Sequence, residues 1–156
     1  MKFRGWMMYL CSVKIKNMRT ITKIILHCSA SRAGVDLTAN DIRSYHCNPI
    51  SQGGRGWKHP GYHYVVRLNG RIEQLLPEHL VANGVKGHNA ESIHVCYVGG
   101  LDLHGKPANT LTAQQRAALN TLLADLLRKY PAAKLHGHNE FAAKACPCFR
   151  VGKLPL

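Results

Sequence analysis

The hydrophobic positions of this chain recur with two different periods, and each period predicts a different kind of element. The run Thr22–Leu26 is apolar and rich in β-branched residues, and it stops before a segment of small residues, so a buried strand is expected with His27 at its carboxyl end. The run Ser92–Val98 is apolar on both faces and is followed by a pair of glycines, which favours a central strand. Lys134–His138 is predicted to form a last, short strand.

A hairpin is predicted in the middle of the chain. Tyr62–Leu68 and Arg71–Leu76 both have strand-like composition, and Asn69-Gly70 lies between them. Asn-Gly is the preferred dipeptide of a two-residue turn, because both of its residues tolerate positive φ. A Gly-rich loop is expected just before the hairpin, from Ser51 to Gly61.

Two helices are predicted, each beginning with a capping box. The capping pairs are Thr38 with Asp41 and Thr112 with Gln115. The first helix is expected over Ala39–Cys47, and the second over Thr112–Tyr130, where leucines recur at helical spacing. Because strands and helices interleave, the expected class is α/β, a single domain with a central mixed sheet flanked by helices.

Composition and length are consistent with one folded domain. The chain has 156 residues, of which 46% are hydrophobic and 19% are charged. Residues 1–20 contain basic side chains but no acidic one, so they are interpreted as a basic N-terminal extension outside the core, and residues 21–156 as the domain. Met18 is an alternative start for that domain.

No segment has the roughly 20 apolar residues that a membrane span requires, and the longest N-terminal candidate is Trp6–Val13. This short stretch lacks a small-residue cleavage site, so the protein is expected to be cytoplasmic as synthesised, with export by an atypical signal left open. We expect a monomer. The six cysteines have no regular small-scaffold spacing, and we expect mostly reduced thiols.

The chain is strongly basic, with 21 Lys and Arg against 8 Asp and Glu. Such a charge attracts polyanions, among them nucleic acid, anionic lipid and a bacterial envelope, but does not distinguish them. Neither a zinc-finger spacing nor a basic recognition helix is found, so no specific nucleic-acid partner is predicted.

Three residues are candidate metal ligands: His27, His138 and Cys146. Zinc accepts imidazole nitrogen and thiolate sulfur, and a catalytic zinc needs three protein ligands and one open position. With ten histidines and six cysteines in the chain, spacing alone does not select this set, and His136 and Cys148 are close alternatives.

Four segments, taken together and in this order, carry a resemblance to a known family. They are Ile24–Ser31, Gly61–Val66, Ser92–Asp102 and Gly137–Pro147. The set resembles the type 2 N-acetylmuramoyl-L-alanine amidases, which include small phage lysozymes and are related to animal peptidoglycan recognition proteins. The resemblance extends from about Ile21 to Phe149.

The resemblance implies a single catalytic Zn²⁺ held by His27, His138 and Cys146, with Tyr62 and Lys144 as catalytic groups that do not bind the metal. The implied reaction cleaves the amide bond between N-acetylmuramic acid and L-alanine in peptidoglycan. A positive charge at Lys144 would stabilise the developing oxyanion. Tyr62 would either orient the attacking water or pass a proton to the leaving amine.

Substrate contacts are expected from Trp57, His88 and Asn89, although Asn89 could instead cap a turn. His63 is expected to be packed or to support a ligand rather than to bind metal. The chain departs from the family pattern at two positions near the expected site. It has Gly84 where the family often has His, and His94 where the family usually has Gly.

Two alternatives to wall lysis follow from the same resemblance. One is a non-catalytic peptidoglycan-binding module, as in relatives that lack the ligand cysteine, but Cys146 is present here. The other is an amidase that recycles released muropeptides. The net positive charge favours a polymeric anionic wall, which an endolysin-like phage or prophage protein would reach after release from the cell.

Overall fold

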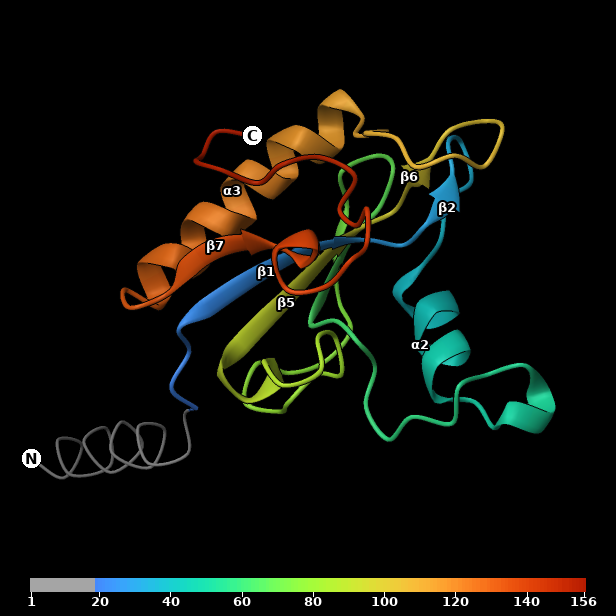
Figure 1. Ribbon diagram of the computed structural model, residues 1–156, viewed down its shortest axis with the longest axis horizontal. Helices are drawn as coiled ribbons and strands as arrows, with labels where there is room; N and C mark the ends of the chain where they lie inside the picture. Colours follow the sequence, from blue (N-terminus) through green and yellow to red (C-terminus); the bar gives the residue numbers. More distant parts are fainter. Residues whose placement is uncertain (1–18) are drawn as a thin grey trace, which may run out of the picture.

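A computed structural model describes residues 19–156 of the chain (Figure 1). The elements in chain order are β1 (Lys23–Cys28), β2 (Ser31–Arg32), α2 (Ala39–Cys47), β3 (Tyr64–Val66), β4 (Ile72–Gln74), β5 (Ser92–Tyr97), β6 (Gly100–Leu101), α3 (Ala113–Lys129) and β7 (Lys134–Gly137). Three short 3₁₀ turns complete the set: η1 (Ile50–Gln52), η2 (Asn89–Glu91) and η3 (His138–Glu140).

The main sheet has five strands in the order β4-β3-β5-β1-β7. The pairs β3–β5, β5–β1 and β1–β7 are parallel, and β3–β4 is antiparallel. The sheet is therefore mixed, and the predicted α/β class with one central mixed sheet is confirmed. Its centre is β5 beside β1, and all six residues of β5 are buried, as its two apolar faces predicted.

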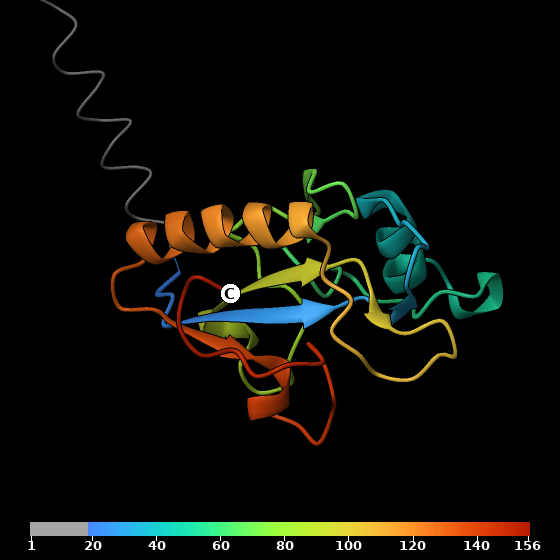
Figure 2. The ribbon, with the colours of Figure 1, turned by 90° about the horizontal axis from the view of Figure 1, so that it is seen from above.

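One face of the sheet packs against α3, and we call it the apolar face. Ile24 and Leu26 of β1 and Val95 of β5 point to this side, where they meet Leu119 and Leu123 of α3. Figure 2 shows α3 running along the sheet on this side. Alternation along each strand sends the intervening residues to the opposite side.

On the opposite side, three buried histidines lie among aliphatic residues such as Ile25, and we call this the histidine face. It is defined by His27 of β1, His94 of β5 and His63 just before β3, each at most 1% exposed. A small apolar cluster that includes Ile42 of α2 and Val65 of β3 adjoins them. Figures 1 and 2 place α2 beyond the carboxyl ends of β1 and β5.

Both helices form where their capping boxes predicted. The Thr38 side chain accepts a hydrogen bond from the Asp41 N–H, and α2 spans Ala39–Cys47 as expected. The Thr112 side chain accepts from the Gln115 N–H, so Thr112 is the cap of α3 and Tyr130 follows its last residue. Local sequence signals sufficed here because a cap satisfies backbone donors within the same turn.

The hairpin forms, but the prediction of long strands joined by a two-residue turn was wrong. The strands are β3 and β4, with Val66 opposite Ile72. The Arg67 N–H donates to the Arg71 carbonyl, and the Gly70 N–H donates to the Arg67 carbonyl, which leaves three residues in the loop. Gly70 has φ of +85°. This is a type I turn followed by a left-handed glycine, the next most common hairpin connection.

Other strand boundaries also differ from the predictions. β1 runs to Cys28, so His27 lies inside the strand, where it pairs with Cys96 of β5. β7 ends at Gly137, and His138 begins η3. The parallel pair β2–β6 was not predicted, because strands of two residues carry no periodic signal.

The predicted N-terminal extension, residues 1–20, lies for its first 18 positions outside the described residues, as do the alternative start at Met18 and the apolar stretch Trp6–Val13. Arg19 is described, and its guanidinium donates to the carbonyls of Glu78, Asn89 and Ser92. Within residues 19–156, no helix is long and apolar enough to cross a membrane. All cysteines of this range are free thiols, as expected.

Candidate metal centre and its surroundings

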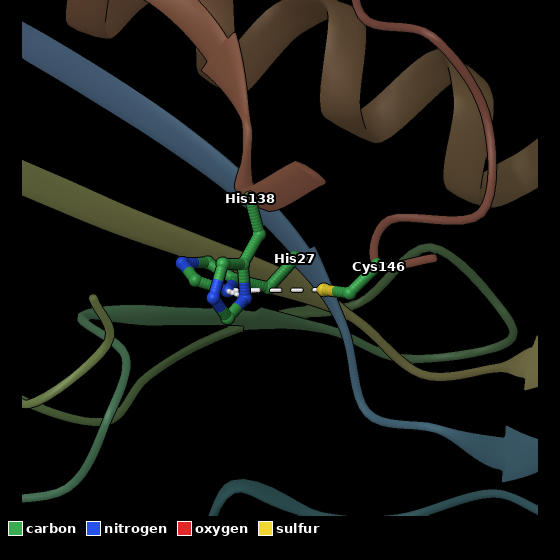
Figure 3. A group of neighbouring side chains, drawn as sticks. All are labelled: His27, His138 and Cys146. Carbon is green, nitrogen blue, oxygen red and sulfur yellow. Dashed lines mark hydrogen bonds between the residues drawn. The ribbon is translucent and has the colours of Figure 1, made fainter. Parts of the chain in front are cut away.

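The three predicted metal ligands meet at the carboxyl ends of two adjacent parallel strands. His27 is near the end of β1, His138 directly follows β7, and Cys146 lies in the loop beyond η3 (Figure 3). Because β1 and β7 are parallel neighbours, their carboxyl ends coincide, and this end of an α/β sheet is where ligands commonly bind.

The spacing of the ligand atoms fits a tetrahedral zinc ion. The Nδ1 atoms of His27 and His138 are 3.1 Å apart, and His27 Nδ1 is 3.9 Å from Cys146 Sγ. The three ligand atoms all lie within 4.8 Å of one another. With Zn–N near 2.0–2.1 Å and Zn–S near 2.3 Å, tetrahedral geometry puts two nitrogens about 3.3 Å apart and nitrogen and sulfur about 3.6 Å apart.

Electrostatics favour the neutral imidazoles that a metal requires. Burial lowers the pKa of His27 well below its usual value, and the neighbouring His94, His138 and Lys144 lower this pKa further. The pKa of His138 is lowered by burial and by Lys144. Both rings are therefore neutral at physiological pH, and a neutral imidazole has a free lone pair for coordination.

The two alternative ligands are engaged elsewhere. The Cys148 thiol donates to the Gly100 carbonyl at 3.1 Å, and burial raises its pKa to about 11. His136 forms a 2.5 Å contact from Nδ1 to Glu140 Oε2 and packs against the ring of Phe141. Among the described residues, the cluster with metal-ligand geometry contains His27, His138 and Cys146 and neither alternative.

The predicted catalytic groups lie beside this cluster. The Tyr62 ring centroid is 5.0 Å from that of His27. The pKa of the Tyr62 hydroxyl is raised well above its usual value, first by removal from water and then by nearby thiols, so it keeps its proton at neutral pH. Lys144 is exposed, lines the same cavity, and is close enough to depress the pKa of both histidines.

A groove of about 570 Å³ leads to the cluster. This volume is within the range of small-ligand sites. The groove is lined by residues from β1, α2 and the loops that follow: His27, Cys28, Ser29, Ala30, Leu37, Asp41, Ile42, Tyr45, His46, Arg55, Trp57, Gly61, Tyr62, Asn83, Gly84, His138, Lys144 and Cys146.

Known proteins provide the decisive comparison. The family described as N-acetylmuramoyl-L-alanine amidase matches residues 17–149. The chain belongs to this amidase family. An endolysin of Enterobacteria phage K11 is 36% identical over 140 residues, which cover 90% of this chain and 89% of that protein.

Two solved structures place the amidase among proteins of the same fold. The Ph2119 endolysin from a bacteriophage of Thermus scotoductus MAT2119 matches with a TM-score of 0.69 and 31% identity, over 82% of this chain and 77% of that one. Drosophila PGRP-LB matches with a TM-score of 0.68 and 22% identity, over 83% and 76% of the two chains, and supports the fold alone.

His46 is a buried residue of the amidase groove that the sequence reasoning missed. His46 of α2 stacks on Trp57 with ring centroids 4.9 Å apart, and its centroid is 5.4 Å from that of Tyr62. The Gly61 N–H donates to His46 Nδ1 at 3.1 Å. The signal was available, because His46 shares the buried side of α2 with Ala39 and Ile42 at helical spacing.

Of the predicted substrate contacts, Trp57 lines the groove, whereas His88 and Asn89 do not. His88 packs against Phe141 with ring centroids 4.5 Å apart. The Asn89 side-chain oxygen accepts from the N–H groups of Gly84 and Val85, at 3.1 and 2.7 Å. Asn89 thus closes a turn beside the groove, and direct substrate contact by His88 or Asn89 stays a prediction.

Proposed function

We propose that this protein hydrolyses the amide bond between N-acetylmuramic acid and L-alanine in peptidoglycan, with zinc held by His27, His138 and Cys146. The observation that carries the proposal is the convergence of these three donors, from segments more than 100 residues apart, beside Tyr62 and Lys144 in one groove. Membership of the amidase family supports the same reaction.

The donor set suits the metal, and the ion would bring chemistry that the side chains lack. When bound, zinc acts as a Lewis acid and lowers the pKa of a coordinated water toward neutrality. The imidazoles of His27 and His138 are held neutral by burial, so they are ready to coordinate without losing a proton.

Lys144 and Tyr62 have roles that follow from their charge and protonation. The Lys144 ammonium supplies positive charge beside the ligands, where the carbonyl oxygen of the scissile amide becomes negative as water adds to the carbon. The Tyr62 hydroxyl keeps its proton at neutral pH, so it can donate a hydrogen bond to the substrate or to the departing alanine amine.

We further propose that the substrate is intact cell wall, reached after release from the producing cell. The net charge of +13 favours binding to a polymeric anionic envelope, and a phage endolysin is 36% identical over most of the chain. Intact wall and released muropeptides can be compared directly as substrates, and faster hydrolysis of muropeptides would support the recycling alternative instead.

The proposal is tested by hydrolysis of purified peptidoglycan with the zinc-loaded protein, measuring new L-alanine amino termini and bound zinc. Cys146→Ser should lose both, whereas the matched control Cys148→Ser should keep both. The loss of activity should be at least about 1000-fold, because the ion provides both the nucleophile and the charge stabilisation. Zinc-loaded wild type that binds peptidoglycan but releases no termini would instead support the non-catalytic binding module.

A further inference from the structure

His94 contacts a proposed zinc ligand on the side away from the metal. It lies on β5 and is fully buried on the histidine face. Its Nδ1 is 2.9 Å from Nε2 of His27, and the ring centroids are 5.1 Å apart. The other ring nitrogen of His27, Nδ1, faces His138 and Cys146.

This contact determines which nitrogen of His27 is free for a metal. If Nδ1 of His27 coordinates the ion, its proton must be on Nε2, and that N–H donates to His94 Nδ1. With the opposite arrangement, His94 Nδ1–H would donate to His27 Nε2, and His27 would have its proton on the nitrogen that faces the ligand cluster. Metal binding therefore requires His94 to be the acceptor.

A second histidine lies parallel to the His94 ring, with ring centroids 6.0 Å apart. The backbone N–H of His94 donates to His63 Nδ1 at 3.0 Å, and the two rings are parallel, with an interplanar angle of 2°. Nδ1 of His63 is thus an acceptor, and its Nε2–H donates to the Leu80 carbonyl at 2.9 Å. The backbone of β5 and the loop at Leu80 therefore fix the His63 ring, against which the His94 ring lies in parallel.

This arrangement leaves a buried polar atom of His94 without a partner. Such an atom reduces folding stability, so its retention indicates a functional role. Nε2 of His94 is buried and has no hydrogen-bond partner among the described residues. Once Nδ1 accepts from His27, Nε2 must have the proton, so an N–H group is left without an acceptor. An orphaned buried donor weakens a fold, and native proteins keep few of them.

Gly84 makes room for the His94 ring. A Cβ atom at position 84 would be 2.5 Å from His94 Nδ1 and 2.7 Å from the Gly61 carbonyl oxygen. The Gly84 N–H donates to the Asn89 side chain, which holds the turn in this position. Gly84 and His94 are thus neighbours in space, and a larger residue at position 84 would displace the His94 ring.

We propose that His94 is a positioning residue that accepts the Nε2–H of His27 and so presents Nδ1 of His27 to zinc, with Gly84 providing the space for its ring. This inference rests on the proposed zinc site. His94 would thus be a hydrogen-bond partner behind the ligand His27. Loss of such a partner typically weakens metal binding by about 10- to 100-fold.

The test is zinc affinity, measured by competition with a chromophoric chelator, for two variants and a control. His94→Phe keeps an aromatic ring but removes the acceptor, and should bind zinc about 10- to 100-fold more weakly. His94→Asn places an oxygen near the position of Nδ1 and should be closer to wild type than to the Phe variant. His104→Phe, the same change at an exposed loop histidine, should match wild type.

The outcomes separate this inference from the proposed function. If the wild-type protein binds no zinc, the proposed metal site is wrong. If the wild type and His94→Phe bind zinc equally tightly, only the role of His94 is wrong. Equal losses in the Phe and Asn variants would also overturn it, because they would indicate packing rather than a hydrogen bond.

A second measurement does not depend on how the variants fold. Long-range ¹H–¹⁵N spectra of the zinc-loaded wild type report which ring nitrogen has the proton. We expect the proton on Nε2 in both His27 and His94, and a protonated Nδ1 on His94 would refute the proposal. Gly84→Ala should also weaken zinc binding, because it displaces the His94 ring. An unchanged zinc affinity would show that Gly84 has no part in positioning His94.

Discussion

At β1 and β5, the two faces of the central sheet are both buried but differ in chemistry. On the apolar face, β1 and β5 present Ile24, Leu26 and Val95 to the leucines of α3. On the histidine face, the same two strands present His27 and His94, each at most 1% exposed. A single residue step along a strand separates an aliphatic core from one that contains buried imidazoles.

The difference shows that one face of the sheet mainly stabilises the fold, whereas the other face also supports the proposed site. Burial of aliphatic side chains depends on neither pH nor ligands, so the apolar face stabilises the protein under all conditions. The histidine face is stable only while its imidazoles are neutral, because burial disfavours their charged form. The histidine face should therefore make the fold sensitive to acid, and it provides the lone pairs that the proposed metal site needs.

Acidification should produce the largest effect and should act through the buried histidines. The pKa of His63 is lowered by burial from 6.5 to about 4, and that of His46 is likewise lowered to about 4. Below pH 6.5 the unfolded state binds these protons and the folded state does not, so stability is complete above pH 6.5 and is lost progressively down to pH 4. Each histidine should contribute about 3 kcal/mol to the loss.

The measurement is the free energy of unfolding of the metal-free protein by denaturant, between pH 7 and pH 4. His63→Gln should flatten this profile, whereas His104→Gln, at an exposed position, should not change it. A free energy of unfolding that is equal at pH 7 and pH 4 would show that the histidine face does not limit stability.

Truncation of a side chain on the apolar face should instead lower stability by an amount that does not depend on pH. Leu123→Ala removes a fully buried side chain between α3 and the sheet and should reduce the free energy of unfolding by about 2–5 kcal/mol. Because no titratable group is changed, the loss should be the same at pH 7 and at pH 5. Leu103→Ala, at a side chain that is 74% exposed, is the matched control and should change stability little.

Removal of the Lys144 charge should have the smallest energetic effect, and it should be confined to catalysis. Lys144→Met should reduce amide hydrolysis about 100-fold, because it removes charge stabilisation in the transition state. Zinc content and thermal stability should be unchanged, since the side chain is exposed. The control is Lys153→Met, also at an exposed lysine. Equal activity of the two variants would exclude Lys144 from the reaction.

Local signals in the sequence determined the helices and most of the strands. The capping boxes at Thr38 and Thr112 correctly predicted where α2 and α3 begin, because a cap involves residues only three positions apart. The apolar run of β5 predicted a central strand, because a strand covered on both faces must be apolar throughout. Family motifs supplied the proposed ligand set of His27, His138 and Cys146, whose side chains the structure brings together and which residue spacing alone could not select.

Tertiary structure decided what depends on contacts between distant segments. The pair β2–β6, the three-residue loop of the hairpin, and the place of His46 in the groove follow from packing rather than from periodicity. His94 is the clearest case, because it lies 67 positions from His27 in the chain. Only the parallel pairing of β1 with β5 brings those two rings together, since a residue's local pattern contains no information about the neighbour across the sheet.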